Sequence, residues 1–437
     1  MEHEFSLADY PAPSKRNILV LQGVASMFFS DLGASLLSRG HKVLRVNFSA
    51  GDRWFWRNQG AINYSGGAAA WPRYIQRLLQ TEQITDILLF GDCREVHRPA
   101  IRAAEARGIA VHVFEEGYLR PNWITLEPHG VNGYSKLPRE PDYYLKEAEK
   151  LPEIPIPQPV AGGMLRRVID DIIWNSLTLL STPFYGGYRT HRPFNAFVEY
   201  SGWMRRLLKT KSNRTHAARI IDSCLQVPGR AYVLALQLDS DYQIRVHSPF
   251  SGMTEVIEKT VASFAAHAPK DSFLIVKNHP LDNGLINHRA TTRDIARKLG
   301  VRSRVRFIDG GHLPSLLDAS RGLIVVNSTV GLSGIHHHCP TITLSNPIYN
   351  MPGLTYQGSL DSFWLEGERA DQNLYKAFRR VIAAQTQLNG NFYTRAGIQL
   401  GIRHAIRQIE AAPLKPVFTN ADAVLDGNFS GLSIIEP

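Results

Sequence analysis

The side chains best suited to chemistry follow apolar, β-branched runs in this sequence. Two adjacent carboxylates, Glu115 and Glu116, come after the run 111–114 and stand before Gly117. In a parallel α/β sheet, ligands bind beyond the carboxyl ends of the strands, so acids at such a point can face a substrate. Two acids and a glycine are also ordinary turn residues, and both interpretations are open at this stage.

The same pattern recurs along the chain: polar residues follow directly after the last apolar residue of each apolar run. The carboxyl ends of parallel strands meet at one edge of a sheet, so we expect these residues to line a binding cleft. The residues predicted to bind a donor substrate in this way are Gly23, Gln237, Asp239, Lys277, Asn278, Pro280, Asn327, Ser328 and Thr329.

Two of these strand ends are suited to a phosphate. His279, between Asn278 and Pro280, carries an imidazole that can donate to or protonate a leaving phosphate, and Lys277 adds positive charge. Ser328 and Thr329 stand where a helix is expected to begin, which is either a site for an anion or simple N-capping. We therefore predict catalytic roles for Glu116, Glu115 and His279.

Other kinds of site are not indicated. His336, His337 and His338 are consecutive, so they point in different directions on a helix and cannot all bind one metal ion. The three cysteines show no CxxC spacing. GxGxxG and GxxxxGK[ST] are absent, which argues against a simple dinucleotide oxidoreductase or a P-loop enzyme. No metal is expected.

Two alternating series of strands and helices are expected to position these residues. The first has strands at 17–23, 41–48, 86–92 and 109–114, with a loop at 51–67 and an irregular region at 121–159. The second has strands at 231–237, 272–277, 304–309, 322–327 and 341–345, followed by a helical tail at 371–411. This order predicts an α/β fold with two Rossmann-like domains, whose parallel sheets face each other across a cleft, plus C-terminal helices. We place the N-terminal domain at 1–215, the C-terminal domain at 216–390, and a helix and tail that pack back on the domains at 391–437.

Residues 164–184 are predicted to form a helix with a broad apolar stripe. Leu165, Val168, Ile169, Ile172, Ile173 and Trp174 fall on one side, opposite Arg166, Asp170 and Asp171. Packing on the core is the favoured interpretation, and docking to a membrane is the alternative.

Bulk properties narrow the class of partner. The chain has 437 residues, a formal net charge of +10 and a pI of about 9.5, which favours anionic partners such as nucleotides, acidic sugars or a membrane surface. No nucleic-acid-binding motif is present, so nucleic acid is not expected. The N-terminus lacks the pattern of a secretory signal and no apolar run is long enough to span a bilayer, so we expect a cytoplasmic protein.

Several tracts together resemble the capsular polysaccharide Kdo transferases of the KpsS type. The tracts are LFGDCR (89–94), HVFEEGYLRPNWITLE (112–127), GVNGYSKLPR (130–139), YRTHRP (188–193), LQLDSD (236–241), HSPF (247–250), VKNHP (276–280) and NSTVGL (327–332). The resemblance implies a GT-B-like fold related to bacterial sialyltransferases, which share an acid-acid-glycine motif, a His-Pro motif and a Ser/Thr pair. Glu116 stands where relatives often carry Asp.

The resemblance also implies the reaction. A retaining glycosyltransferase of this kind takes Kdo from CMP-Kdo and adds it to a lysophosphatidylglycerol-type lipid, starting the poly-β-Kdo linker of a capsule at the inner face of the cytoplasmic membrane. It implies no cofactor and no essential metal, with a partner Kdo transferase and the capsule export machinery as further partners. The alternatives are another CMP-sugar transferase, of the sialyltransferase type, or a non-catalytic component of capsule assembly or export.

Overall fold

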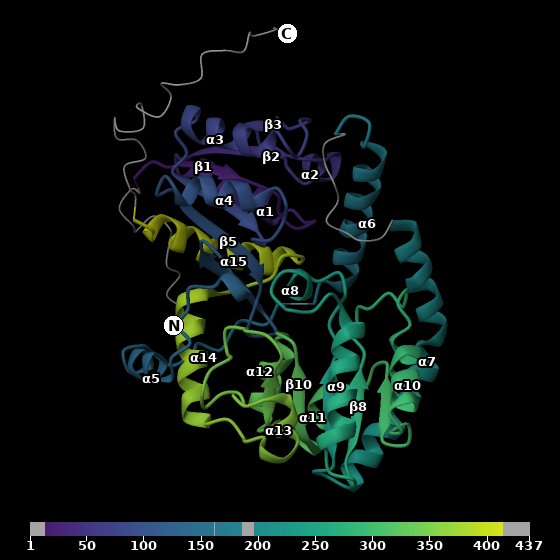
Figure 1. Ribbon diagram of the computed structural model, residues 1–437. Helices are drawn as coiled ribbons and strands as arrows, with labels where there is room; N and C mark the ends of the chain where they lie inside the picture. Colours follow the sequence, from purple (N-terminus) through teal and green to yellow (C-terminus); the bar gives the residue numbers. More distant parts are fainter. Residues whose placement is uncertain (1–13, 161, 186–195, 414–437) are drawn as a thin grey trace, which may run out of the picture. The chain divides into compact units, whose positions relative to one another are not determined.

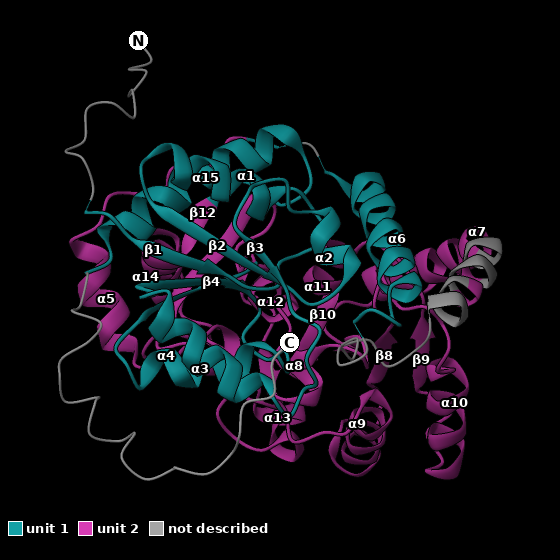
Figure 2. Ribbon diagram, turned by 90° about the horizontal axis from the view of Figure 1, so that it is seen from above, with its two compact units in different colours: residues 1–115, 159–189, 389–437 teal, residues 116–158, 190–388 magenta. Residues whose placement is uncertain are grey.

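The computed structural model describes residues 14–160, 162–185 and 196–413, apart from the side chains of 196–200, 203–205 and 207–209. Its contacts divide it into two compact units (Figures 1 and 2). Unit 1 comprises 1–115, 159–189 and 389–437, and unit 2 comprises 116–158 and 190–388. The tract YRTHRP (188–193) lies outside the described residues. The domain limits expected from the sequence stay a prediction.

Unit 1 is built on parallel strands with helices on both faces. Hydrogen-bonded strands run in the order β5-β4-β1-β2-β3: Ala110–Glu116, Asp86–Phe90, Asn17–Val20, Lys42–Asn47 and Ala61–Asn63. Beyond β5 the order continues to β6 (Trp123–Pro128) and β12 (Gln387–Asn389). Figure 2 shows α1 (Phe28–Ser38) and α15 (Arg395–Ala411) on one side of the strands, and α3 (Trp71–Thr81) and α4 (His97–Glu105) on the other.

Unit 2 contains a second parallel sheet, with strands in the order β11-β10-β7-β8-β9: Thr341–Thr343, Ser320–Val325, Ala231–Ala235, Phe273–Lys277 and Val305–Ile308. Alternation along the strands fills two cores. Tyr232 and Leu234 pack with α9 (Met253–His267) and α13 (Leu360–Glu366), whereas Val233 and Ala235 pack with α7 (Ala196–Gln226) and α11 (Leu313–Ala319). Both faces of β7 are therefore buried, as its unbroken apolar run predicts.

Unit 2 contains six further helical elements among the described residues. They are η2 (Asn132–Tyr134), α5 (Pro141–Glu149), α8 (Tyr242–Arg245), α10 (His288–Lys298), α12 (Val330–His336) and α14 (Gln372–Thr386). Helix α5 packs against α14, and Tyr144 of α5 contacts Phe378 of α14 at a centroid distance of 4.9 Å.

The α/β class and the GT-B-like plan of two Rossmann-like units with parallel sheets are confirmed, together with the C-terminal helices α14 and α15. Three local expectations are wrong. The loop expected at 51–67 contains β3 and most of α2 (Ala50–Trp54). Helix α2 is capped by Ser49, which accepts a hydrogen bond from the Asp52 N–H. The region 121–159 contains β6 and α5, and the tail 371–411 is interrupted by β12.

The apolar stripe at 164–184 also faces a direction that was not favoured. Helix α6 (Met164–Leu180) turns Leu165, Val168, Ile169 and Ile172 outward, and its buried residues are Asp170, Trp174 and Asn175. Core packing is therefore wrong for these four outward residues, whereas Trp174, which was assigned to the same stripe, is buried where α6 packs against α2. Within the described residues, no helix is long and apolar enough to cross a membrane.

Candidate functional site

The two glutamates lie within a strand rather than after it. Strand β5 runs on through Glu115 and Glu116, both of which are partly exposed. The residue before them, Phe114, is fully buried, and its ring packs edge-on against Phe28 and Phe29 at centroid distances of 5.5 and 5.3 Å. This aromatic cluster fixes the end of β5 and hence the start of the acidic pair.

Consecutive side chains of a strand point to opposite faces, so the two carboxylates diverge. Glu115 lies on the side of Gly91, where a Cβ would be 3.6 Å from its Oε2 atom. The backbone carbonyl of Glu116 accepts a hydrogen bond from the Thr125 hydroxyl of β6 at 3.1 Å. Direct orientation of Glu116 by the carboxylate of Glu115 is therefore not the arrangement that this backbone favours.

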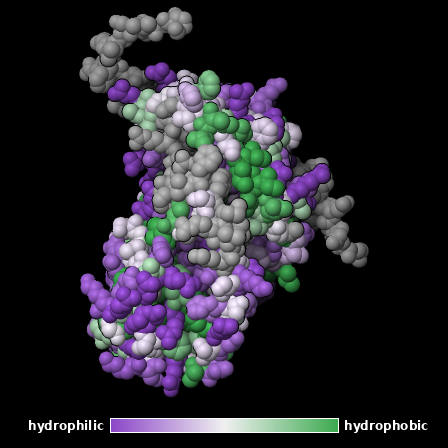
Figure 3. All heavy atoms as spheres, turned by 90° about the vertical axis from the view of Figure 1, so that its right-hand side faces the viewer, coloured by the Kyte–Doolittle hydropathy of each residue, from purple (hydrophilic) through white to green (hydrophobic). Residues whose placement is uncertain are grey.

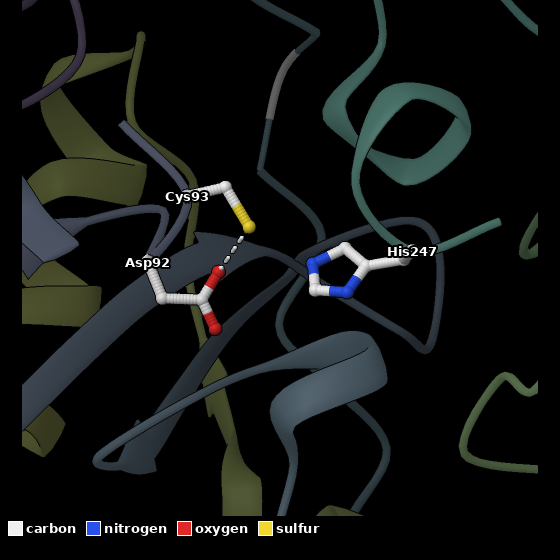
Figure 4. A group of neighbouring side chains, drawn as sticks. All are labelled: Asp92, Cys93 and His247. Carbon is white, nitrogen blue, oxygen red and sulfur yellow. Dashed lines mark hydrogen bonds between the residues drawn. The ribbon is translucent and has the colours of Figure 1, made fainter. Parts of the chain in front are cut away.

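The residues after β4 add a thiol and another carboxylate to the same end of unit 1. Figure 4 shows the Cys93 thiol directed at Asp92, to whose Oδ1 atom it donates at 3.1 Å. Burial and the neighbouring Asp92 raise the pKa of the Cys93 thiol, so the sulfur stays protonated at neutral pH. His247, drawn in the same figure, belongs to unit 2, where its ring packs edge-on against Tyr134 at 4.7 Å.

Gly23 also belongs to unit 1, apart from the other predicted donor-binding residues, which lie in unit 2. Its carbonyl accepts a hydrogen bond from Arg94 at 2.9 Å, and the same guanidinium group donates to the Gln22 side chain at 2.9 Å. A Cβ at Gly23 would lie 2.5 Å from a ring carbon of Phe29, so the position requires glycine.

In unit 2, three strand ends predicted to lie together do so. Strands β10, β7 and β8 are neighbours in the sheet. After β7 and β10, the Gln237 amide donates to Asn327 Oδ1 at 2.9 Å, and the Asn327 backbone N–H donates back to Gln237 Oε1 at 3.2 Å. Asn327 also donates to the carbonyl of Gln243 at 2.6 Å. Both side chains are buried, so they hold the loops at this edge in place.

His279 follows β8 and has a defined protonation pattern. Its Nδ1 atom accepts the backbone N–H of Leu281 at 3.1 Å, which places the proton of a neutral ring on Nε2. Burial is the largest cause that lowers the His279 pKa, to about 4, and the positive charges of Lys277, Arg120 and Arg206 lower it further, against an opposing effect of Asp282. At neutral pH the ring is uncharged and presents Nε2–H as a hydrogen-bond donor.

The turn that carries His279 is held by a network that the sequence analysis did not find. Arg206 of α7 donates to the His279 carbonyl at 3.1 Å, to the Asp282 carbonyl and to the Asp309 carboxylate. The Asn278 amide donates to Asp282 Oδ2 at 3.0 Å, and its Oδ1 accepts the His279 N–H at 3.0 Å. Arg206 lies 73 residues from His279 in a helix with no local motif, so no sequence signal marks it.

Two further cations approach this edge of unit 2. Lys277 is 6% exposed, and burial lowers the pKa of its ammonium group against the raising effect of Asp309. Arg120, four residues after Glu116, is exposed, and its charge acts on both His279 and Asp241. The tract EEGYLRP thus brings a cation toward the His-Pro turn, although the sequence analysis singled out only its acids.

Ser328 and Thr329 begin α12 in a capping arrangement. The Ser328 hydroxyl accepts the Val330 N–H at 3.2 Å, and its carbonyl accepts the Gly331 N–H and the Tyr349 hydroxyl. Thr329 occupies the N-cap position without a side-chain capping bond. Because α12 has only seven residues, the two hydroxyl groups are better candidates for contact with an anion than the helix dipole is.

The predicted donor-binding residue Asp239 and the histidine triplet, for which no metal site was expected, both make protein contacts. Asp239 accepts hydrogen bonds from His288 Nε2 at 2.8 Å and from the Met253 N–H at 2.9 Å. Burial alone would raise the Asp239 pKa, but these hydrogen bonds lower it. Asp239 therefore anchors α9 to α10. In the histidine triplet, His337 pairs with Asp318 at 2.7 Å and the His336 ring packs toward Tyr375.

Comparison with known proteins decides the family. Residues 85–393 match the family described as capsule polysaccharide biosynthesis protein. The chain belongs to this family. It is 33% identical over 383 residues to the capsule polysaccharide export protein KpsS of Escherichia coli, an alignment covering 87% of this chain and 97% of that protein. It is 34% identical to the capsule polysaccharide modification protein LipB of Neisseria meningitidis, covering 87% and 93%. The resemblance to the KpsS type drawn from the tracts is confirmed.

Solved structures with related folds include the β-Kdo 2,7 transferase of Thermosulfurimonas dismutans KpsC. It shares 11% sequence identity with this capsule biosynthesis chain, with a TM-score of 0.42, covering 90% of this chain and 99% of that one. The β-Kdo 2,4 transferase of the same organism gives 15% identity and a TM-score of 0.39, covering 90% and 98%.

Proposed function

We propose that this family member is a retaining glycosyltransferase that moves Kdo from CMP-Kdo to a lysophosphatidylglycerol-type lipid and so starts the poly-β-Kdo linker of a capsule. The family membership supports a role in capsule biosynthesis. The observation that carries the proposal is the strand end of β8, where a neutral imidazole with Nε2–H available stands beside Lys277 and within the electrostatic range of Arg120.

This arrangement suits a nucleoside monophosphate leaving group. In the transfer, the bond between the anomeric carbon and the phosphate oxygen of CMP breaks, and a bond to the acceptor hydroxyl forms. CMP departs as an anion, which His279, Lys277 and the hydroxyl groups of Ser328 and Thr329 would stabilise by hydrogen bonds and charge. These groups make a divalent metal or a cofactor dispensable in the proposed reaction, so activity should persist in a chelator.

Glu116 is the proposed acid-base or nucleophilic group, and Glu115 a supporting one. The Glu116 carboxylate either removes the proton of the acceptor hydroxyl or attacks the anomeric carbon to form a covalent intermediate. Retention follows from the second route, in which the acceptor hydroxyl then displaces Glu116, whereas direct attack by the acceptor on CMP-Kdo would invert the anomeric carbon. Glu116→Gln preserves the shape of the side chain and removes the carboxylate. We expect a loss of at least about 100-fold in transfer rate, and a smaller loss in Glu115→Gln.

The decisive assay is mass spectrometry of the product formed from CMP-Kdo and a lysophospholipid, with CMP-sialic acid as the competing donor. Transfer from CMP-sialic acid alone would make the protein another CMP-sugar transferase of the sialyltransferase type. If a folded Glu116→Gln variant supported linker synthesis as well as the wild type does, the protein would instead be a non-catalytic component of capsule assembly or export. The name of the E. coli relative gives that alternative its specific support.

The remaining parts of the proposal follow from the acceptor. A lipid acceptor places the enzyme at the inner face of the cytoplasmic membrane as a peripheral protein. The next partners in such a reaction sequence would be a second Kdo transferase, which extends the linker, and the capsule export machinery.

A further inference from the structure

Helix α6 is amphipathic, but unlike a helix that covers a core it turns its apolar side outward and its more polar side inward. Its inward side is comparatively polar: Asp170 is 2% exposed, Asn175 is buried, and Ser181, directly after the helix, donates from its hydroxyl to the Thr178 carbonyl and accepts the Ala50 N–H. Its outward side is apolar. The exposed large hydrophobic residues of this helix are Met164, Leu165, Val168, Ile169, Ile172, Leu179 and Leu180.

Specific contacts hold α6 in this orientation. The Trp174 indole N–H donates to Asp52 Oδ1 at 3.2 Å, and the Thr178 hydroxyl donates to the Ser49 hydroxyl at 3.2 Å. A Cβ at Gly51 would lie 2.6 to 2.7 Å from Thr178 and Trp174, so α2 and α6 approach as closely as a glycine allows. Turning the apolar side inward would break these contacts and remove Trp174 from its buried position against α2.

The outward side forms one continuous surface. Leu165 and Leu180 are each 75% exposed and lie near opposite ends of a 17-residue helix, about 22 Å apart along its axis at 1.5 Å per residue. Figure 3, which views the side on which α6 lies in Figure 1, shows a band of apolar residues there. We call the seven outward apolar residues of α6 the α6 face. A patch of this kind on a protein surface marks an interaction site rather than a solvated surface.

The charges around the α6 face select its partner. No acidic residue of α6 is exposed, because Asp170 is buried against Arg166 and Asp171 is partly buried. Arg166 is 58% exposed, and the neighbouring α2 ends in an exposed Trp54 whose ring lies 5.1 Å from the guanidinium group of the exposed Arg57. Apolar residues flanked by Arg and Trp match the boundary between the headgroups and acyl chains of an anionic bilayer.

We propose that the α6 face is a membrane-docking surface that inserts into the headgroup region of an anionic phospholipid bilayer, with α6 lying in the membrane plane. By this surface the proposed lipid-modifying enzyme would reach its acceptor. It does not depend on which sugar nucleotide the enzyme uses, since docking requires neither donor nor catalysis.

The test is sedimentation of the full-length protein with phosphatidylcholine vesicles that contain or lack phosphatidylglycerol. The docking variant is Leu165→Gln/Ile169→Gln/Ile172→Gln. The matched control is Ile156→Gln/Leu365→Gln, at residues 94% and 66% exposed outside α6. All five side chains are at least 41% exposed, so both variants should fold, as circular dichroism would verify.

We expect the wild type and the control to sediment with the phosphatidylglycerol vesicles, and the partition coefficient of the docking variant to be at least about tenfold lower. Equal sedimentation of the two variants would overturn the proposal, as would a wild type that stays in the supernatant. A wild-type dimer in light scattering that the docking variant converts to a monomer, with no vesicle binding, would assign the α6 face to a second copy instead.

A donor assay separates this proposal from the proposed function. CMP release from CMP-Kdo with a short, soluble acceptor should be unchanged in the docking variant. If no CMP-Kdo turns over but the variants still differ in vesicle binding, the enzymatic proposal fails while the docking surface stands.

Discussion

The protonation of His279 leads to a prediction that two near-isosteric variants can test. Asparagine at this position can still accept the Leu281 N–H through its amide oxygen, but it places no donor where Nε2–H stands. Glutamine reaches the Nε2 position with its amide nitrogen but cannot serve the Leu281 N–H in the same way. His279→Asn therefore preserves the turn and removes the donor, whereas His279→Gln keeps a donor.

The magnitude follows from the loss of one hydrogen bond to a charged phosphate, worth about 1.5 to 3 kcal/mol. We expect the kcat/KM of His279→Asn to fall by about 10- to 100-fold and that of His279→Gln to fall less. His216→Asn, at an exposed histidine of α7, is the control and should leave kcat/KM unchanged. Initial rates of CMP release from CMP-Kdo provide the measurement.

The pH profile gives an independent check. Because the His279 pKa is about 4 in the folded protein, the neutral ring should persist and kcat/KM should show no His279 inflection between about pH 8 and about pH 5. Arg120 is one of the charges that lower this pKa, so Arg120→Ala should move the acid limb to higher pH. A wild-type inflection near pH 6.5 that disappears in His279→Asn would refute the reasoning.

The same pKa makes a prediction about stability. The folded pKa lies below the unfolded value of about 6.5, so the stabilisation is complete above pH 6.5 and is lost as the pH falls from there toward 4. The free energy of unfolding changes by up to about 3 kcal/mol over this range, because the folded and unfolded pKa of His279 differ by about 2.5. In urea unfolding, the wild type should lose up to about 3 kcal/mol more stability than His279→Asn as the pH falls from 6.5 to 4, because only the wild type carries the titrating imidazole.

Two further predictions concern the elements that support the site. Arg206→Ala should lower the free energy of unfolding by about 2 to 3 kcal/mol and kcat/KM by more than tenfold, because the His279 turn and Asp309 lose their shared donor. The control, Arg219→Ala on the exposed side of α7, should change neither quantity. Gly331→Ala would place a Cβ 2.2 Å from the Tyr349 hydroxyl and should cost about 1 to 3 kcal/mol in thermal unfolding, whereas Gly67→Ala, with open space around it, should cost less than about 0.5 kcal/mol.

The sequence was most informative where buried parallel strands end. A strand covered on both faces reads as an unbroken apolar run, so the first polar residue after it marks the carboxyl edge of the sheet. Applied to β7 and β10, this rule brought Gln237 and Asn327 together across 90 residues, and the structure joins them by two hydrogen bonds. It could not separate residues that face a ligand from residues that hold loops, because both are polar and follow the same strands.

Longer-range partners escaped sequence reasoning for a physical reason. Periodicity shows that α6 has an apolar side, but the direction of that side depends on whether α2 pairs with the polar side instead. The Trp174 to Asp52 hydrogen bond that decides this spans 122 residues. Arg206 is similar, since it is one of four arginines in a helix of 31 residues and nothing local indicates that it binds two carbonyl groups of a distant turn.

The acidic pair is the point at which the structure changes the chemical argument most. Two adjacent glutamates after a strand could have acted on one substrate atom, but β5 continues through both, and the twofold alternation of a strand sends their carboxylates to opposite faces. Glu115 is directed toward Gly91 and influences the Cys93 thiol. The two residues therefore cannot substitute for each other. If they were interchangeable, Glu115→Gln and Glu116→Gln would lower the transfer rate by the same factor, whereas we expect the loss in Glu116→Gln to be much larger.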